Sequence, residues 1–234
     1  MEPSVSLQKL ECFLRLLSHD VRNDLNAIDL LGVYLQELSE QEEVRQEILQ
    51  LRASVRFAAQ RMVRISKALH CPEPELVDYP LADLMEDWKS SWQAGEEGRR
   101  DSFPDSIGVD WERVQDRVLV RVDGLLVFEA LGELLENAGA FSPRGQRVRI
   151  RAGEGIPEKA MVQIEQSFRG DSLPEPLICP GVLFESGRRG HYGIGLFRAR
   201  RILESFGADL RFSLDSKAGK LSTWVHFAIG EGTE

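Results

Sequence analysis

Two long stripes of apolar residues in the first third of the 234-residue chain constrain its fold more than any other feature. Over Leu7–Leu38, apolar residues recur at steps of three and four with no intervening proline, as in one long amphipathic helix. Over Val44–Leu69 these steps alternate strictly, which is typical of a coiled-coil seam, and Pro72 and Pro74 end it. Because only residues 39–43 connect the stripes, we expect two antiparallel neighbouring helices.

One hairpin of this kind cannot bury two full apolar seams by itself. We therefore expect a homodimer in which two hairpins form a four-helix bundle, although helices from later in the same chain could also complete such a bundle. We place the hairpin domain at residues 1–72 and a second domain at residues 73–234, because the sequence beyond Pro74 changes from helical stripes to mixed helical and strand-like patterns.

The second domain combines helical and strand-like patterns, so the chain as a whole is predicted to be of the α+β class. Helices are expected around Leu81–Gln93, Leu125–Ala140 and Leu196–Phe206. Alternating strands are expected at Ile107–Trp111, Val118–Val122, Val148–Ala152, Met161–Gln166, Asp209–Leu214 and Leu221–Ile229, with a turn at Gly153–Gly155. This order predicts an α/β sandwich with a largely antiparallel sheet.

Composition excludes several classes of partner and compartment. A formal charge of -9 without a basic, aromatic-rich block disfavours nucleic acid. Three separated cysteines, Cys12, Cys71 and Cys179, suggest neither a disulfide framework nor a zinc site. No run of about 18 uncharged apolar residues is present, and charges interrupt any signal-peptide core, so we expect a cytoplasmic protein that does not insert into a membrane.

The stretch SHDVRNDL contains the first candidate reactive group. His19 precedes the stripe residue Val21 by two positions, about 200° around a helix, and is expected to face solvent. Imidazole is a competent nucleophile near neutral pH, unlike an amine or a hydroxyl. Asp20 can orient the ring or accept its proton, and Asn23 shares the face at i+4, where an amide can position water. An exposed histidine beside ordinary charges remains the alternative for this stretch alone.

A second motif, ELLENAGAFSP, places Glu133 and Asn137 one helical turn apart. A carboxylate and an amide oxygen on one face can hold a magnesium-bound phosphate.

A third motif, HYGIGLFRARRIL, contains Gly193 and Gly195 just before a helix. The glycines allow close backbone approach, and the first amides of the helix suit an anion. Arg188 and Arg189, immediately upstream, add positive charge.

The order of these motifs resembles the catalytic core of sensor histidine kinases over nearly the whole chain. The resemblance implies a dimerising hairpin that carries a phosphorylated histidine, followed by an ATP-binding sandwich of the type shared with gyrase, Hsp90 and MutL. His19 would be the phosphoacceptor, Asp20 would assist proton transfer, and Asn23 would match the residue used in dephosphorylating a response regulator. Asn137 would coordinate Mg²⁺ if a nucleotide binds.

The same resemblance places Phe184 ahead of a nucleotide lid, and Gly193 and Gly195 at its end. The adenine pocket departs from the family pattern, because Gln166 replaces an aspartate and Phe168 replaces a glycine. A lost charged hydrogen bond costs about 1.5 to 3 kcal/mol, on the order of ten- to a hundredfold in affinity. The amide oxygen of Gln166 can still accept a hydrogen bond from an adenine amine.

Two smaller departures affect the same pocket. Ala140 replaces a common lysine, and His191 replaces the first lid glycine. Together the four changes predict weak or absent nucleotide binding, whereas the histidine motif is intact.

The first hypothesis is therefore a histidine phosphotransferase that exchanges a phosphoryl group between His19 and a response-regulator aspartate. It requires no cofactor of its own, because the response regulator would supply magnesium. An ATP-dependent histidine kinase with an atypical adenine pocket, which would use Mg²⁺ and ATP, is the alternative. A non-catalytic module that binds a response-regulator receiver domain is the third hypothesis, and Asn23 leaves a phosphatase activity open.

Overall fold

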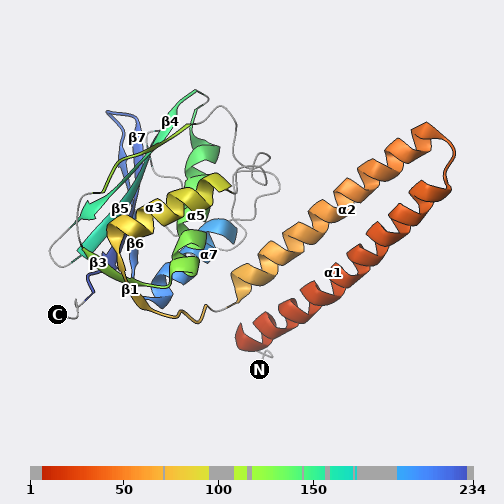
Figure 1. The fold of residues 1–234 in the computed structure, drawn as a ribbon, viewed down its shortest axis with the longest axis horizontal. Helices are drawn as coiled ribbons and strands as arrows, with labels where there is room; N and C mark the ends of the chain where they lie inside the picture. The colour runs from red at the N-terminus through yellow and green to blue at the C-terminus, as the bar shows by residue number, and fades with distance from the viewer. Residues whose placement is uncertain are drawn as a thin grey trace. The chain divides into compact units, whose positions relative to one another are not determined.

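In a computed structural model of the chain, the described residues are 7–70, 72–94, 108–114, 118–143, 145–155, 159–170, 172 and 194–230. The chain divides into two compact units, Met1–Cys71 and Pro72–Glu234. Figure 1 shows the first unit in red to orange and the second in yellow to blue.

The first unit is a hairpin of α1 (Leu7–Leu38) and α2 (Glu42–Leu69), which run antiparallel and side by side (Figure 1). This confirms the predicted pair of helices. The short connection is held by the backbone N–H of Ser39, which donates to the carbonyl of Leu35 at 3.1 Å, and by Arg45, whose Nε donates to the carbonyl of Ser39 at 2.7 Å. Although these helices are long, no helix within the described residues is apolar enough to cross a bilayer.

The later part of the leucine stripe of α1, at Leu31, Leu35 and Leu38, does not face α2. Gly32 of α1 is buried beneath the side chain of Arg52, whose Nε donates to Asp29 at 2.9 Å. In contrast, Leu31 is 60% exposed and Leu35 is 51% exposed. Since neighbouring residues of a helix differ by about 100° in direction, the contact with α2 and the stripe occupy different sides of α1. The single hairpin therefore leaves the later part of its apolar stripe uncovered.

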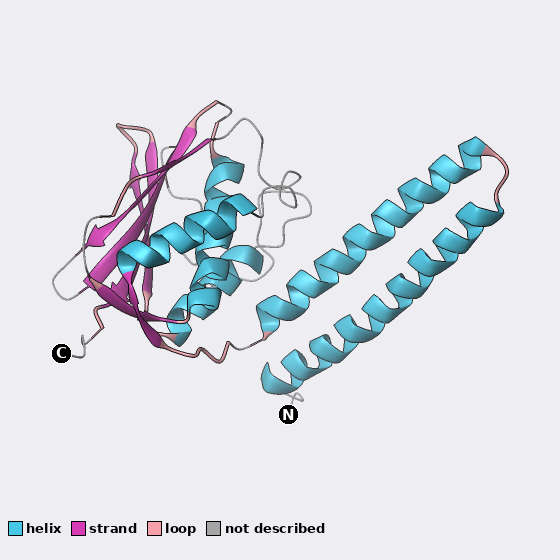
Figure 2. Cartoon of the chain, in the orientation of Figure 1, coloured by secondary structure: helices cyan, strands magenta, loops and turns pink. Residues whose placement is uncertain are grey.

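The second unit is a five-stranded sheet with helices on one face (Figure 2). The strands lie in the order β2 (Gly108–Trp111), β4 (Arg147–Glu154), β5 (Lys159–Ser167), β7 (Lys220–Ala228) and β6 (Asp209–Asp215). The helices are α3 (Leu81–Ala94), α5 (Gly124–Phe141) and α7 (Ile194–Ser205). Only the β2–β4 pair is parallel, so the predicted α/β sandwich with a largely antiparallel sheet is confirmed.

The core lies between this sheet and its helices. On β5, Ala160, Val162 and Ile164 alternate toward the helices and are fully buried or nearly so, as a period of two requires. Asp123 caps α5, because its carboxylate accepts hydrogen bonds from the first amides of the helix at 3.0 Å. This cap fixes where α5 begins and hence which of its residues face the core.

Two local features differ from the sequence prediction. A strand that was not predicted, β1 (Val77–Pro80), pairs antiparallel with β3 (Leu119–Val122) as a separate two-stranded sheet. The predicted turn at Gly153–Gly155 begins too early, because Gly153 and Glu154 still belong to β4 and pair with β5. The hydrogen-bonded pairing of β4 continues past Gly153, because β5 is nine residues long and offers backbone N–H and C=O groups there.

Candidate functional site

His19 lies on an open side of α1, as its spacing predicted. Its side chain is 66% exposed and that of Asp20 is 77% exposed. The imidazole Nδ1 lies 3.3 Å from Oδ1 of Asp20 and 3.3 Å from Nδ2 of Asn23. The structure therefore brings the three predicted residues of the first motif together, because a continuous helix places i, i+1 and i+4 around one ring.

The two hydrogen bonds of His19 are alternatives, because both use the same nitrogen. With a proton on Nδ1, the ring donates to Asp20 and Nε2 keeps its lone pair. Without that proton, Nδ1 accepts from Asn23 and Nε2 carries the hydrogen. Asp20 therefore favours the tautomer in which Nε2 is a nucleophile.

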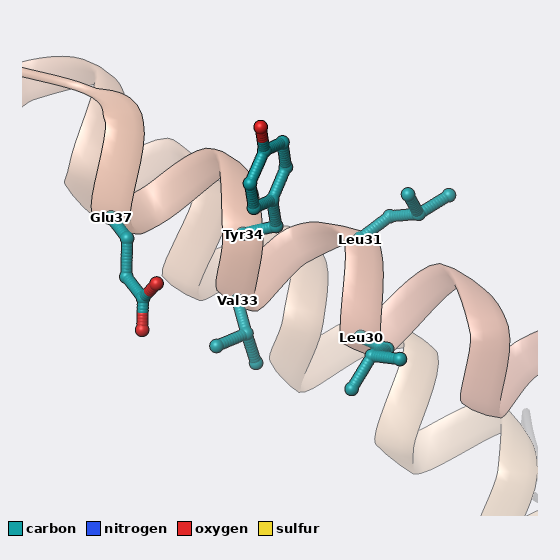
Figure 3. A pocket seen from close by; sticks show the side chains of 5 residues that line it. All are labelled: Leu30, Leu31, Val33, Tyr34 and Glu37. Carbon is teal, nitrogen blue, oxygen red and sulfur yellow. The ribbon is translucent and has the colours of Figure 1, made fainter.

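An apolar pocket lies on the same side of α1 as His19. Leu30 follows His19 by eleven residues (30 − 19), close to three helical turns, so the two side chains project within about 20° of one another. Around this pocket, Leu31 and Tyr34 extend to one side and Val33 and Glu37 to the other (Figure 3). Leu30 and Tyr34 are strongly exposed. A partner that approaches His19 along this face would meet apolar surface.

The second unit brings together two residues from different motifs. Glu133 of α5 lies directly against Gly195 in the first turn of α7, where a Cβ would collide with a carboxylate oxygen and lie 3.3 Å from the carboxyl carbon. The group that lies closest to Gly195 in this structure is therefore the carboxylate of Glu133. Asn137 lies one turn further along the same helix α5.

Gln166 and Phe168 lie at the end of β5. Gln166 has the same strand parity as the core residue Ile164 and is buried, 3% exposed. Phe168 is half-buried, and its ring folds back over Gly170, with Cε1 2.6 Å from where a Cβ would stand. Gln166 is therefore directed to the helix-covered face of the sheet, where the sequence placed a pocket residue.

Other predicted residues of this region lie outside the described residues: Phe184, Arg188, Arg189, His191 and Gly193. Among the residues that are described, no group of three histidine, cysteine, aspartate or glutamate side chains could hold a metal ion.

One polar contact beside this region was not predicted. Arg198 of α7, 7% exposed, places Nε 3.2 Å from a carboxylate oxygen of Glu129 on α5. Glu129 precedes Glu133 by one helical turn, so the pair fixes α7 against the same face of α5. In the sequence, the signal that could have indicated this contact is the i, i+4 pair Glu129 and Glu133 on one helix, together with the several arginines of the later helix.

Comparison with known proteins identifies relatives of one kind. No protein-family model matches the sequence. The chain is 28% identical over 242 residues to the sensor histidine kinase AruS of Pseudomonas aeruginosa, covering 91% of this chain and 22% of that protein. It is 26% identical over 240 residues to the adaptive-response sensory kinase SasA of Thermosynechococcus vestitus, covering 95% of this chain and 60% of that protein. The chain therefore spans only part of both relatives.

Solved structures with a similar fold include histidine kinases. A crystal structure of full-length ShkA in complex with AMPPNP matches 98% of this chain and 47% of its own, with a TM-score of 0.74 at 15% identity. The catalytic domain of histidine kinase ThkA matches 66% of this chain with a TM-score of 0.51 at 18% identity. The chain is thus similar in sequence to sensor histidine kinases, and it has the fold of a histidine kinase catalytic core, a helical hairpin followed by an ATPase-type sandwich.

Proposed function

We propose that the chain is a histidine phosphotransferase that exchanges a phosphoryl group between His19 and an aspartate of a response-regulator receiver domain. The observation that carries the proposal is the exposed ring of His19, with Nδ1 beside Asp20 and Nε2 left open. This site needs no nucleotide, because phosphoryl transfer depends mainly on positioning and on charge neutralisation.

The chemistry of the transfer balances without an added proton. The lone pair on Nε2 forms the N–P bond while the P–O bond of the aspartyl phosphate breaks, and the electron pair of that bond leaves with the carboxylate. The Nδ1 proton remains on the ring, where the carboxylate of Asp20 offsets the positive charge that develops. The reverse step returns the phosphoryl group to an aspartate, with magnesium supplied by the receiver.

The proposed partners are a receiver domain and a second copy of the chain. A receiver that reaches Nε2 must cover the side of α1 that also carries Leu30 and Tyr34. The second copy would cover the leucine stripe, in line with the family resemblance. The proposal implies a cytoplasmic protein whose hairpin and sandwich act as separate domains divided near Pro72.

An ATP-dependent histidine kinase is the second candidate, and the sensor kinase names of the relatives favour it. Asn137 would then hold Mg²⁺, and the start of α7 near Gly195 would receive phosphates. The buried Gln166 gives the pocket an uncharged amide in place of a carboxylate, which favours weak nucleotide binding. The carboxylate of Glu133, beside Gly195, would reach a phosphate only through Mg²⁺.

The transferase proposal is tested by mixing the chain with a panel of receiver domains phosphorylated with acetyl phosphate. Wild type should gain acid-labile phosphate and His19→Ala should gain none. His70→Ala is the matched control, since His70 is also exposed and belongs to the same unit. If wild type gains no phosphate from any receiver, or His19→Ala gains as much, the proposal is wrong.

Calorimetry with ATP and magnesium tests the kinase candidate. Binding at micromolar strength that is lost in Asn137→Ala, together with label from γ-phosphate on His19, would establish it over the transferase. If both assays are negative while a receiver still binds, the chain is a non-catalytic binding module.

A further inference from the structure

Phe168 is an aromatic residue at the end of β5, on the face of the sheet that the helices cover. Its backbone N–H donates to the carbonyl of Gly219 at 2.9 Å, so the pairing of β5 with β7 continues one residue beyond Ser167. Since alternate residues of a strand point to the same face, Phe168 projects to the side of Gln166 and of the core residue Ile164. The ring is therefore directed toward the helices, and not toward the open face of the sheet.

The ring of Phe168 fills the space beside Gly170. Its atoms Cε1, Cζ and Cδ1 lie 2.6, 3.1 and 3.5 Å from the place of a Cβ on Gly170. Exposure rises along this side of the chain, from Gln166, which is 3% exposed, through the half-buried Phe168 to the exposed Gly170. The ring thus lies between the buried amide and the surface residue, at the end of β5.

The turn between β6 and β7 holds the backbone of Phe168 in place. The carboxylate of Asp215 accepts hydrogen bonds from two backbone N–H groups of this turn, at 3.0 Å each. Gly219 follows with a φ of 61°, a conformation that glycine adopts without strain, and its carbonyl accepts the hydrogen bond from Phe168. Because the backbone beneath it is fixed, the ring loses little freedom when it packs over its glycine neighbour.

The family resemblance places an adenine pocket at Gln166 and Phe168, where two separate effects oppose nucleotide binding. Loss of a carboxylate at Gln166 lowers the affinity on the order of ten- to a hundredfold. Such a weakened site still fills when the nucleotide concentration is raised. A ring already packed in the place of the base has a different effect, because two groups cannot share one close-packed space.

We propose that the ring of Phe168 occupies the place of a nucleotide base in the sandwich, and that this occlusion, in addition to the missing charge at Gln166, prevents nucleotide from binding. The side chains at this end of β5 therefore do not fit an adenine, and removal of the ring opens a site for a purine nucleotide. The occlusion lies within the second unit, so it agrees with a transferase that uses no nucleotide but does not depend on phosphoryl transfer at His19.

Calorimetry of the full chain with ADP and Mg²⁺ tests the occlusion. Wild type and Gln166→Asp should show no saturation at millimolar ADP, whereas Phe168→Gly should saturate there. The double variant Phe168→Gly with Gln166→Asp should bind ADP about ten- to a hundredfold more tightly than Phe168→Gly, since it adds a charged hydrogen bond. Phe168→Tyr is the matched control, because it keeps the ring and should bind no ADP.

Proton NMR checks the position of the ring without any nucleotide. An aromatic ring shifts the resonances of protons that lie against it, so the Hα protons of Gly170 should differ in chemical shift between wild type and Phe168→Leu. Phe168→Tyr should resemble wild type. Circular dichroism checks that each variant folds, and if Phe168→Gly does not, Phe168→Ala takes its place in the binding assay.

Saturable binding of ADP by wild type, or by Gln166→Asp as tightly as by the double variant, would show that Phe168 does not occlude the site. The occlusion is equally overturned if neither Phe168→Gly nor the double variant binds ADP, or if the Gly170 resonances are the same with and without the ring. Binding by the double variant alone supports it, because Gln166→Asp keeps the ring. None of these results decides the transferase proposal, whose assay with phosphorylated receivers contains no nucleotide.

Discussion

At the scale of single residues, the chemistry of His19 depends on which neighbour holds Nδ1. Asp20 can only accept there, whereas the Nδ2 atom of Asn23 can only donate. Asp20 therefore favours the tautomer with a free lone pair on Nε2, whereas Asn23 favours the tautomer with a hydrogen on Nε2. This competition gives each of the two side chains a separable effect on phosphoryl transfer.

Replacing Asp20 by asparagine should slow phosphorylation of His19 by roughly ten- to a hundredfold, because the amide cannot offset the charge that develops on the ring. The measurement is the initial rate of phosphate uptake from a phosphorylated receiver. Asp24→Asn is the matched control, since Asp24 lies about 140° around the helix from His19. Equal rates in the two variants would show that the carboxylate of Asp20 has no part in the reaction.

His226 in β7 should make stability depend on pH. It is 8% exposed and its Nδ1 meets no hydrogen-bond partner among the described residues. Burial, reinforced by Arg211 and Lys159 and opposed by Asp209, lowers the pKa of His226 below the usual value for histidine. The unfolded chain thus takes up a proton more readily, so this contribution is complete at neutral pH and is lost as pH falls through the mildly acidic range.

The check is the urea midpoint of the sandwich domain between pH 7.5 and pH 5 in wild type and His226→Gln. The variant should lose less stability on acidification than wild type. His70→Gln, at an exposed position, should retain the wild-type slope. Parallel curves for wild type and His226→Gln would contradict the expectation.

Sequence could predict some of these residues because their geometry is local. A continuous helix fixes the relation of His19 to Asp20 and Asn23, so spacing alone was sufficient. The contact of Glu133 with Gly195 joins residues 62 positions apart (195 − 133), and it depends on how α5 and α7 pack. The burial of His226 depends on sheet register, which its alternating strand pattern does not specify by itself.

At the scale of elements, a polar contact specifies how α1 and α2 pair. Hydrogen bonds from Arg52 and the nearby charge of Arg56 hold the pKa of Asp29 below its usual range, against the opposing effect of burial. Arg52 also donates to Gln36 at 2.8 Å, one helical turn above Gly32. Gly32 has no side chain, and the stem of Arg52 fills the space. The side chain of Arg52, which lies across α1 at Gly32, therefore fixes the register of α2 against α1.

Gly32→Ala should reduce stability by about 1 kcal/mol, although alanine favours a helix by about 1 kcal/mol over glycine. A Cβ there would lie 2.7 Å from Cγ of Arg52 and 3.0 Å from Cδ, so the arginine must move and its charged hydrogen bonds weaken. In an Arg52→Ala background the same change should instead stabilise the helix. Chemical denaturation, followed by circular dichroism at 222 nm, gives the free energy of unfolding for each member of this double-mutant cycle. Equal effects of Gly32→Ala in both backgrounds would rule out a clash with Arg52 as the cause.

The elements that sequence analysis missed are those with little pattern. The strand β1 is four residues long, contains Pro80, and is exposed at Val77 and Asp78. Such a segment shows no alternation of apolar and polar residues. It becomes a strand because its backbone pairs with that of β3. The long helices and the alternating strands β5 and β7 were predicted because their periodicity reports burial directly.

At the scale of the whole molecule, the exposed apolar stripe of α1 determines whether the chain is expected to associate with a second copy. The side that meets α2 carries Asp29, Gly32 and Gln36, whereas Leu31, Leu35 and Leu38 remain more than half exposed. A stripe of this length on an isolated hairpin favours association, because covering one leucine stabilises by about 1.5 to 3 kcal/mol. A second copy of the chain offers an identical stripe, and symmetric pairing is the commonest way for a protein to cover one.

The double variant Leu31→Asp with Leu35→Asp should therefore weaken self-association by at least about a hundredfold, since two leucines that the second copy would cover become two charges that repel across the interface. Light scattering with size-exclusion chromatography should show wild type as a dimer and this variant as a monomer. Leu30→Asp is the matched control, because Leu30 is 72% exposed and lies on the side of α1 that carries His19. That control should remain dimeric. A wild type that is monomeric at micromolar concentration, or a double variant that still dimerises, would show that the stripe is covered by something other than a second copy.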